Sequence, residues 1–111
     1  MPASIRIRPE DCPLPSNEKL TAATKAYADP TDALTSGIWR SKANRIEVAY
    51  TKDEFCLIVE GEVHLTDAEG RTEIYGQGDG FLVPAGFRGV WDMPVPVTKF
   101  YVLHAPRTAG S

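Results

Sequence analysis

Along much of this chain, polar and apolar residues alternate one by one, which is the pattern of strands that bury one face. In the clearest example, Arg45 and Glu47 fall on one side of the segment. Ile46, Val48 and Tyr50 fall on the other side. The alternation has the period of two that is typical of a β-strand, so this segment predicts a half-buried strand.

Further short segments of this kind follow one another closely. They cover residues 37–40, 54–60, 62–66, 71–75, 81–83, 90–92 and 98–103. Turn-forming residues separate them: residues 67–70 predict a hairpin turn, and Gly76, Gly78 and Gly80 mark the next corner. About eight or nine short strands with glycine-rich corners predict an all-β sandwich or barrel.

The N-terminal part of the chain has a different composition. Residues 1–18 contain four prolines, which lack a backbone donor and fix φ, so we expect an extended arm. Within this arm, residues 5–8 alternate and could add an edge strand. Residues 19–28 predict either one short helix or a loop. The expected organisation is an arm over residues 1–28, a β-barrel over residues 29–105 and a loose tail over residues 106–111.

The bulk composition narrows the class of partner. With 111 residues, of which 42% are hydrophobic, the chain fits one domain with its own core. Its net charge of −3 argues against a nucleic-acid partner, which needs a basic surface.

No apolar run approaches the roughly 20 residues that span a bilayer, and no signal core is present, so we expect no membrane partner and a cytoplasmic location. Cys12 and Cys56 are therefore expected to be free thiols.

Two segments have a more specific spacing. In the first, Glu54 stands ahead of an apolar run that ends at Gly61. In the second, Gly78-Asp79 leads through an apolar strand to Pro84-Ala85-Gly86. A Gly-Asp pair before a strand makes a tight turn, and a proline ends one strand before the next begins. Both segments therefore predict strand corners of defined geometry.

Together, these segments resemble the two motifs of the cupin superfamily. In detail, residues 35–103 are similar to the ureidoglycine aminohydrolase-type cupins through Gly37-x-Trp39, Asp53-Glu54, Val59-Glu60-Gly61, Pro84-Ala85-Gly86-Phe87-x-Gly89-x-Trp91 and Val97-Thr98-Lys99-x-Tyr101. The resemblance implies an all-β, RmlC-like cupin jelly-roll β-barrel. It also implies a homodimer, in which the arm of residues 1–28 could pair with or swap onto the partner subunit.

The resemblance also identifies the positions at which metal-binding cupins carry their ligands. Two histidines precede the motif glutamate, and a third follows the Pro-x-Gly corner. The first pair corresponds to Val48 and Tyr50, or to Glu47 and Ala49, and the third corresponds to Gly89. Only Glu54 remains of this set, and a transition-metal site needs three or four donors in a fixed geometry. We therefore expect no metal and no other cofactor.

The mouth of such a barrel can hold a ligand among apolar side chains and a few polar groups. Glu54 is the candidate catalytic residue, because a buried carboxylate can act as general acid or base. The candidate ligand-binding residues are Trp39, Tyr50, Cys56, Trp91, Lys99 and Tyr101. In the structural alternative, Glu54 only pairs with Lys99 or Arg88, or bonds Tyr50. Cys56 and the aromatic residues would then belong to the core or to a dimer interface.

Three functions follow from this interpretation. The first is a metal-independent barrel that binds a small molecule. The second is an enzyme that acts on a small nitrogen-containing metabolite, as the ureidoglycine aminohydrolase resemblance implies, with Glu54 as acid or base. The third is a structural domain that serves only to dimerise.

Overall fold

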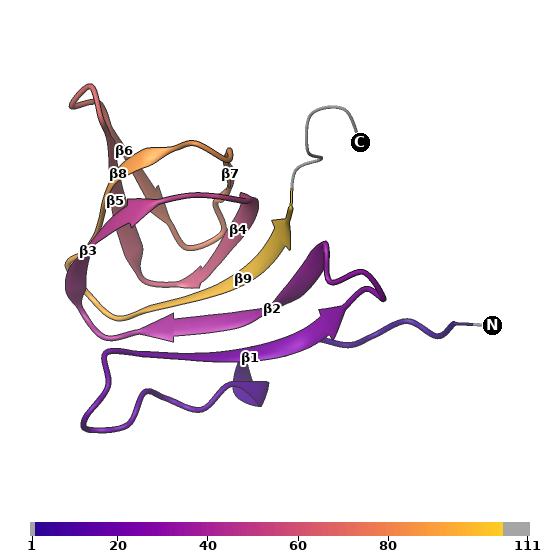
Figure 1. Cartoon of the computed structure of the whole chain (residues 1–111). Coiled ribbons are helices and arrows are strands. Elements are labelled where there is room, and N and C mark those ends of the chain that lie inside the picture. Colours follow the sequence, from indigo (N-terminus) through magenta and orange to yellow (C-terminus); the bar gives the residue numbers. More distant parts are fainter. Residues whose placement is uncertain (1, 106–111) are drawn as a thin grey trace, which may run out of the picture.

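The computed structural model describes residues 2–105 and consists almost entirely of β-strands (Figure 1). A short 3₁₀ helix, η1, covers Pro9–Asp11. The strands are β1 Thr21–Ala28, β2 Leu34–Ser41, β3 Asn44–Ala49, β4 Asp53–Glu60, β5 Glu62–Asp67, β6 Thr72–Gly76, β7 Gly80–Val83, β8 Arg88–Met93 and β9 Val97–His104. The all-β class expected from the alternation is confirmed. The tail expected for residues 106–111 lies outside the described residues.

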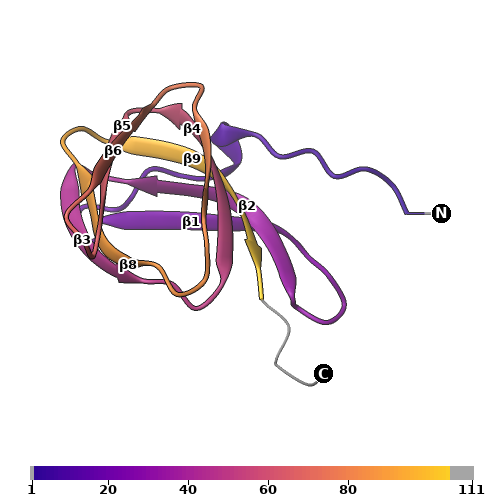
Figure 2. The ribbon, with the colours of Figure 1, turned by 90° about the horizontal axis from the view of Figure 1, so that it is seen from above.

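The strands form two antiparallel sheets that face each other (Figures 1 and 2). One has the order β1-β2-β9-β4-β7, and the other has the order β3-β8-β5-β6. Most neighbours in space are therefore not neighbours in sequence: β9, the last strand, lies between β2 and β4. Such crossovers between two packed sheets are those of a jelly roll.

The core lies between the two sheets and is formed by alternate residues of the strands. Its buried members are Cys56, Ile58, Val63, Leu65, Phe81, Val83, Trp91, Met93 and Val97. The alternation predicted for β3 is confirmed, because Arg45 and Glu47 are exposed while Ile46 and Val48 are partly buried. In β4, Glu54 is buried on the same inward face as the core residues, as the parity predicts.

Two corners illustrate how local sequence turns the chain. The predicted hairpin between β5 and β6 is confirmed, since the Gly70 amide donates to the Asp67 carbonyl at 3.0 Å. At the corner between β4 and β5, Gly61 has a φ of 97°. A Cβ at Gly61 would also collide with the Pro96 carbonyl oxygen. Glycine is thus required at this motif position both for its backbone angle and for the close approach of the neighbouring chain.

The prediction for residues 19–28 is wrong, because this segment forms neither a helix nor a loop. Thr21–Ala28 is strand β1, which pairs with β2 along its whole length. Its alanines have a high helix propensity, but the hydrogen bonds offered by the edge of β2 outweigh that preference. Residues 5–8 form no strand. The alternation of isoleucine and arginine there is too short to hold a strand without a partner.

The N-terminal arm lies against the outer face of its own sheet from Arg8 to Pro13. The guanidinium of Arg40 in β2 donates from Nε to the Cys12 carbonyl at 2.8 Å and from Nη2 to the Pro9 carbonyl at 2.7 Å. Cys12 is buried beneath this contact. The first residues of the arm, before η1, extend away from the barrel (Figure 2). Pairing of this end with a partner subunit stays a prediction.

None of the helices in residues 2–105 has the length and apolar character that crossing a membrane requires. The cytoplasmic location stays a prediction.

Candidate functional site

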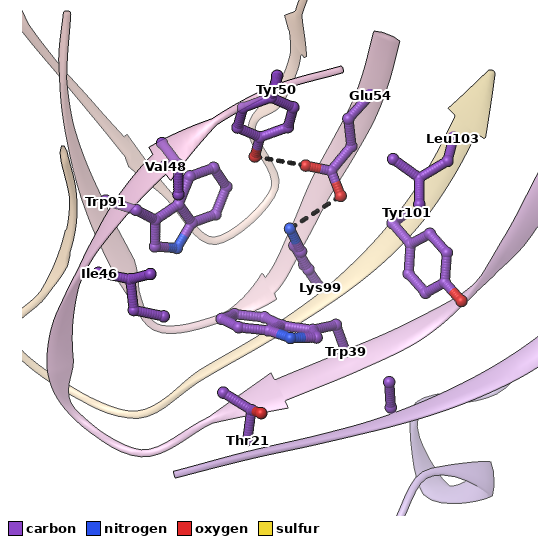
Figure 3. Close-up of a pocket in the computed structure, with 11 residues that line it drawn as sticks. Thr21, Trp39, Ile46, Val48, Tyr50, Glu54, Trp91, Lys99, Tyr101 and Leu103 are labelled. Carbon is purple, nitrogen blue, oxygen red and sulfur yellow. Dashed lines mark hydrogen bonds and ion pairs between the residues drawn. The ribbon is translucent and has the colours of Figure 1, made fainter. Parts of the chain in front are cut away.

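One cavity of about 510 Å³ opens between the two sheets beside β1 (Figure 3). It is lined by Thr21, Ala23, Trp39, Ile46, Val48, Tyr50, Glu54, Trp91, Lys99, Tyr101 and Leu103. Apolar and aromatic side chains form most of this lining, and a few polar groups converge on one end. That combination is typical of a small-molecule site, and the volume lies within the usual range for one.

The polar end of the cavity is built on the carboxylate of Glu54. Tyr50 Oη donates a hydrogen bond to Glu54 Oε1 at 2.7 Å, and Lys99 Nζ donates to Oε2 at 3.0 Å (Figure 3). These three residues are called the Tyr50–Glu54–Lys99 cluster below. Each carboxylate oxygen therefore has its own partner, one neutral and one positively charged.

The strands position the two charged members of the cluster. Glu54 lies in β4, where it is paired with Val83 on one side and with Leu103 on the other. Lys99 lies two pleats further along β9, opposite Ile58. Its long side chain runs back along the cavity to the carboxylate, which a shorter side chain would not reach.

Tyr50 is positioned by the loop between β7 and β8. Its amide donates to the Phe87 carbonyl at 2.9 Å, and its own carbonyl accepts from the Gly86 amide at 2.8 Å. The Phe87 ring also packs edge-on against the Tyr50 ring, with their centroids 6.0 Å apart. The Pro84-Ala85-Gly86 corner of the sequence motif therefore fixes the residue that donates to Glu54.

Besides Glu54, two aromatic rings near Lys99 favour its positive charge. Its Nζ lies 4.7 Å from the ring centre of Trp39 and 4.3 Å from that of Trp91. The two indoles pack edge to face, 6.3 Å apart. The side chains of Lys99 and Glu54 are each only 7% exposed. Charges buried to this extent must be paired, and the aromatic faces add a favourable interaction with the ammonium.

Burial changes the acidity of two groups near the carboxylate. Desolvation, followed by the charge of Glu54, raises the pKa of Tyr50 far above its ordinary value, so its phenol keeps the proton that it donates. Desolvation also raises the pKa of Cys56 to about 12, although the Lys99 charge acts in the opposite direction. Cys56 is therefore a thiol, and not a thiolate nucleophile, at neutral pH.

The structure brings most of the predicted site residues together. Six of the seven line the cavity: Trp39, Tyr50, Glu54, Trp91, Lys99 and Tyr101. Cys56 does not, because it is fully buried beneath Lys99, with its Sγ 3.7 Å from Nζ. Of the partners expected for Glu54, Lys99 and Tyr50 both contact it, whereas Arg88 is exposed on β8.

Five lining residues were not predicted. Ile46 and Val48 share the face of Tyr50, and Leu103 shares the face of Tyr101, so the alternation of their strands contained the signal. Thr21 and Ala23 come from β1. They could not be placed from the sequence, because this segment was expected to be a helix or a loop outside the barrel.

The side chains of this cavity do not fit the metal that many cupins hold. Val48 offers no donor atom, and the oxygens of Glu54 already have partners. At Gly89, a Cβ would collide with the Thr66 carbonyl oxygen, so a ligand side chain has no room there. Within residues 2–105, no three His, Cys, Asp or Glu side chains converge on one point. A transition metal needs more donors than this arrangement supplies.

A family model described as the EutQ-like cupin domain matches residues 28–101. Among curated proteins, none matches the chain. Among solved structures, a putative ethanolamine utilization protein Q of Salmonella typhimurium LT2 is similar, with a TM-score of 0.70 and 22% identity over 82% of this chain and 74% of that one.

Two further solved structures extend the likeness. A DUF861 family protein of Thermotoga maritima has 33% identity and a TM-score of 0.56 over 58% of this chain and 73% of its own. An RmlC-like cupin of Shewanella frigidimarina has 16% identity and a TM-score of 0.64 over 85% of this chain and 91% of its own. At these identities and coverages, the solved structures agree on the cupin fold.

Proposed function

Because the chain belongs to the EutQ-like cupin domain family, we propose that it is a barrel that binds a small molecule without a metal ion. The observation that carries this proposal is the carboxylate of Glu54, whose two oxygens are bonded by Tyr50 and Lys99. In this chain an ammonium group occupies the place beside the carboxylate that a cation would need. The remaining space is a cavity of about 510 Å³ with aromatic walls, which suits an organic ligand.

A thermal-shift screen in the presence of a chelator tests this proposal. The protein is mixed with small amides, ureides, carboxylates and amines, and its melting temperature is measured. We expect at least one class to raise the melting temperature, since a ligand that binds only the folded state stabilises it. The shift should not depend on added metal. If none of these classes changes the melting temperature, the proposal is contradicted.

A pair of cavity variants gives this screen a matched control. Ala23 lines the cavity and is exposed on the edge strand β1, so Ala23→Trp should fill the mouth with little effect on folding. Ala49 is equally exposed on β3 but does not line the cavity, so Ala49→Trp is the control. We expect the ligand-induced shift to be lost in the first variant and kept in the second.

The enzymatic alternative is a reaction on a nitrogen-containing metabolite of the ureidoglycine aminohydrolase type, with Glu54 as acid or base. Glu54 does line the cavity, as this role requires. However, its two oxygens are engaged within the protein, so a substrate would have to displace Tyr50 or Lys99 before a proton could be transferred. Any activity found for the protein should be measured in Glu54→Gln, and activity that survives this change excludes Glu54 from the chemistry.

A second candidate role is dimerisation, and an exposed apolar patch favours it. Phe55, Leu82 and Val102 lie side by side on the outer face of β4, β7 and β9, and they are 42%, 71% and 36% exposed. Their register neighbours on the same face, Leu57 and Phe100, are also apolar. A symmetric contact places the same patch of two copies together, so any charge in it would face a like charge. Because this patch is uncharged, a second copy of the chain suits it. The oligomeric state of a Leu82→Asp variant tests this role.

A further inference from the structure

The charges of the cavity are balanced within the protein. Among the lining side chains, Glu54 and Lys99 carry the charges, and they bond to each other at 3.0 Å. The third polar group of the cluster, Tyr50, keeps its proton and is neutral. Thr21 and Tyr101 add uncharged hydroxyl groups. A ligand in this cavity therefore meets no unpaired charge.

A charged ligand would disturb the balance of the buried pair. A carboxylate at Lys99 would compete with Glu54 for the one ammonium and would lie beside a like charge. An ammonium or amidinium would compete with Lys99 for Glu54 and would lie beside a like charge. Either exchange leaves one ion poorly paired in an apolar cavity, and this cost opposes binding.

An uncharged ligand can use the hydrogen-bonding capacity that the cluster leaves free. The ammonium of Lys99 has three N–H groups, of which one is directed to Glu54 and a second to the Cys56 sulfur at 3.7 Å, which leaves the third for a ligand. The Tyr50 oxygen donates its proton and can still accept. An amide matches this arrangement, because its carbonyl accepts from an ammonium and its N–H donates to a phenol oxygen.

The aromatic wall supplies a second, independent observation. Trp91 Nε1 is buried, and it is the one buried side-chain nitrogen or oxygen in residues 2–105 that has no hydrogen-bond partner. Buried donors of this kind are rare, since each costs free energy until an acceptor is found. Trp91 and Trp39 also present flat apolar rings to the cavity (Figure 3). Nε1 itself has almost no accessible surface, so the cavity is offered the faces of the rings, which favour a flat ligand.

We propose that the ligand is an uncharged, planar molecule with an amide group, held with its amide on the Tyr50–Glu54–Lys99 cluster and its plane against the indoles. This proposal rests on the proposed small-molecule function and names the ligand class. Its distinguishing feature is charge: the cavity selects the neutral member of a set of molecules that have the same shape.

Benzoate, benzamide and benzamidinium form such a set, because they are planar, nearly equal in size and differ in charge at pH 7. Their dissociation constants are measured by calorimetry or ligand-observed NMR with the full chain in chelator. Benzamide should bind at least about tenfold more tightly than either charged molecule. Equal or tighter binding of a charged molecule would overturn the proposal. If none of the three binds but the metabolite screen finds a ligand, this ligand class is wrong and the small-molecule function stands.

Two single variants should reverse the charge preference. Lys99→Met leaves Glu54 unpaired, so benzamidinium should become the tightest ligand of the three. Glu54→Gln leaves Lys99 unpaired, so benzoate should become the tightest. Preference for benzamide in both folded variants would contradict the role of the ion pair. Since a variant could fail to fold, the comparison in the unchanged protein remains the decisive one.

Discussion

Each oxygen of the Glu54 carboxylate has a different partner, and together these partners explain how a charge is kept inside the barrel. Lys99 neutralises it, and Tyr50 satisfies the second oxygen with a neutral donor. Replacing such a buried pair with neutral groups costs little, whereas removing one partner leaves an uncompensated ion. The pair is therefore a strongly coupled unit, and its coupling can be measured.

A double-mutant cycle tests this coupling. Glu54→Gln and Lys99→Met should each lower the free energy of unfolding by about 3–5 kcal/mol, because each leaves one ion unpaired. The loss of unfolding free energy in the double variant should be smaller than the sum of the two single losses by at least about 2 kcal/mol. Urea unfolding gives these values. Glu60→Gln and Lys25→Met are the controls, since both side chains are exposed. Additive losses would contradict the coupling.

Stability should also fall at alkaline pH. Folding raises the pKa of Cys56 from 9.0 to about 12, so above pH 9 the unfolded thiol loses a proton that the folded thiol keeps. The free energy of unfolding should then fall by about 1.4 kcal/mol per pH unit between the two values. Tyr50 acts in the same direction above pH 10. In Cys56→Ala, urea unfolding between pH 9 and 10 should show a smaller slope, and an unchanged slope would contradict this assignment.

For single residues, the sequence predicted the direction of a side chain better than it predicted the contacts of that side chain. Parity correctly placed Glu54 and Cys56 on one face. It could not decide between Lys99 and Arg88 as the partner of Glu54, because both have long side chains and either strand could have been the neighbour. The outward orientation of Arg88 depends on how β8 pairs with β3 and β5, which is a long-range property.

Among the elements, the N-terminal arm is held in place by one side chain. The guanidinium of Arg40 donates hydrogen bonds to the carbonyls of Pro9 and Cys12, and its Nη1 donates to Thr98 Oγ1 at 3.1 Å. The arm then covers the outer face of β2, where Ile38 is only 1% exposed. The segment before β1 therefore packs on the five-stranded sheet without adding a strand to it.

Arg40→Ala should release the arm while leaving the barrel folded. Without the guanidinium, the buried Cys12 should become accessible to a thiol reagent at pH 8, and the modified residue is identified by mass spectrometry. The melting temperature should fall by several degrees, as expected for a loss of about 2 kcal/mol. Arg45→Ala on the exposed face of β3 is the control. Continued protection of Cys12 in the Arg40 variant would show that other contacts hold the arm.

Strand prediction succeeded for β3, β4 and β5 but failed for β1. The first three have alternating burial, which follows directly from alternating sequence. β1 contains four alanines and lies at the edge of its sheet, so no sharp alternation of large apolar residues marks it. Its pairing with β2 decides its conformation, and a short sequence window does not contain that contact.

The whole molecule assembles the site from distant parts of the chain. The cavity takes Trp39 from β2, Glu54 from β4, Trp91 from β8 and Lys99 from β9, and strand β9 lies between the strands that carry the first two. The motif resemblance indicated the jelly roll and so the proximity of these strands. The cavity's shape and its border along β1 follow from sheet order, which the sequence alone did not determine.

The exposed apolar patch on the five-stranded sheet leads to a prediction about the oligomeric state of the whole molecule. If Phe55, Leu82 and Val102 form the dimer contact, Leu82→Asp should shift sedimentation from dimer towards monomer by placing two like charges in the interface. Ile74→Asp is the control, because Ile74 is 57% exposed on the other sheet. A protein that is monomeric throughout, or a dimer that the Leu82 change leaves intact, would contradict this assignment.

The central claim is that Lys99, and not a metal ion, is the cation that neutralises Glu54. Calorimetric titration of Zn²⁺, Mn²⁺ and Ni²⁺ into chelator-treated protein, followed by elemental analysis after dialysis, tests it most directly. The pairing of Glu54 with Lys99 predicts less than about 0.1 metal ion per chain at micromolar metal, with no difference between the unchanged protein and Glu54→Gln. One tightly bound ion per chain that disappears in Glu54→Gln would contradict the claim.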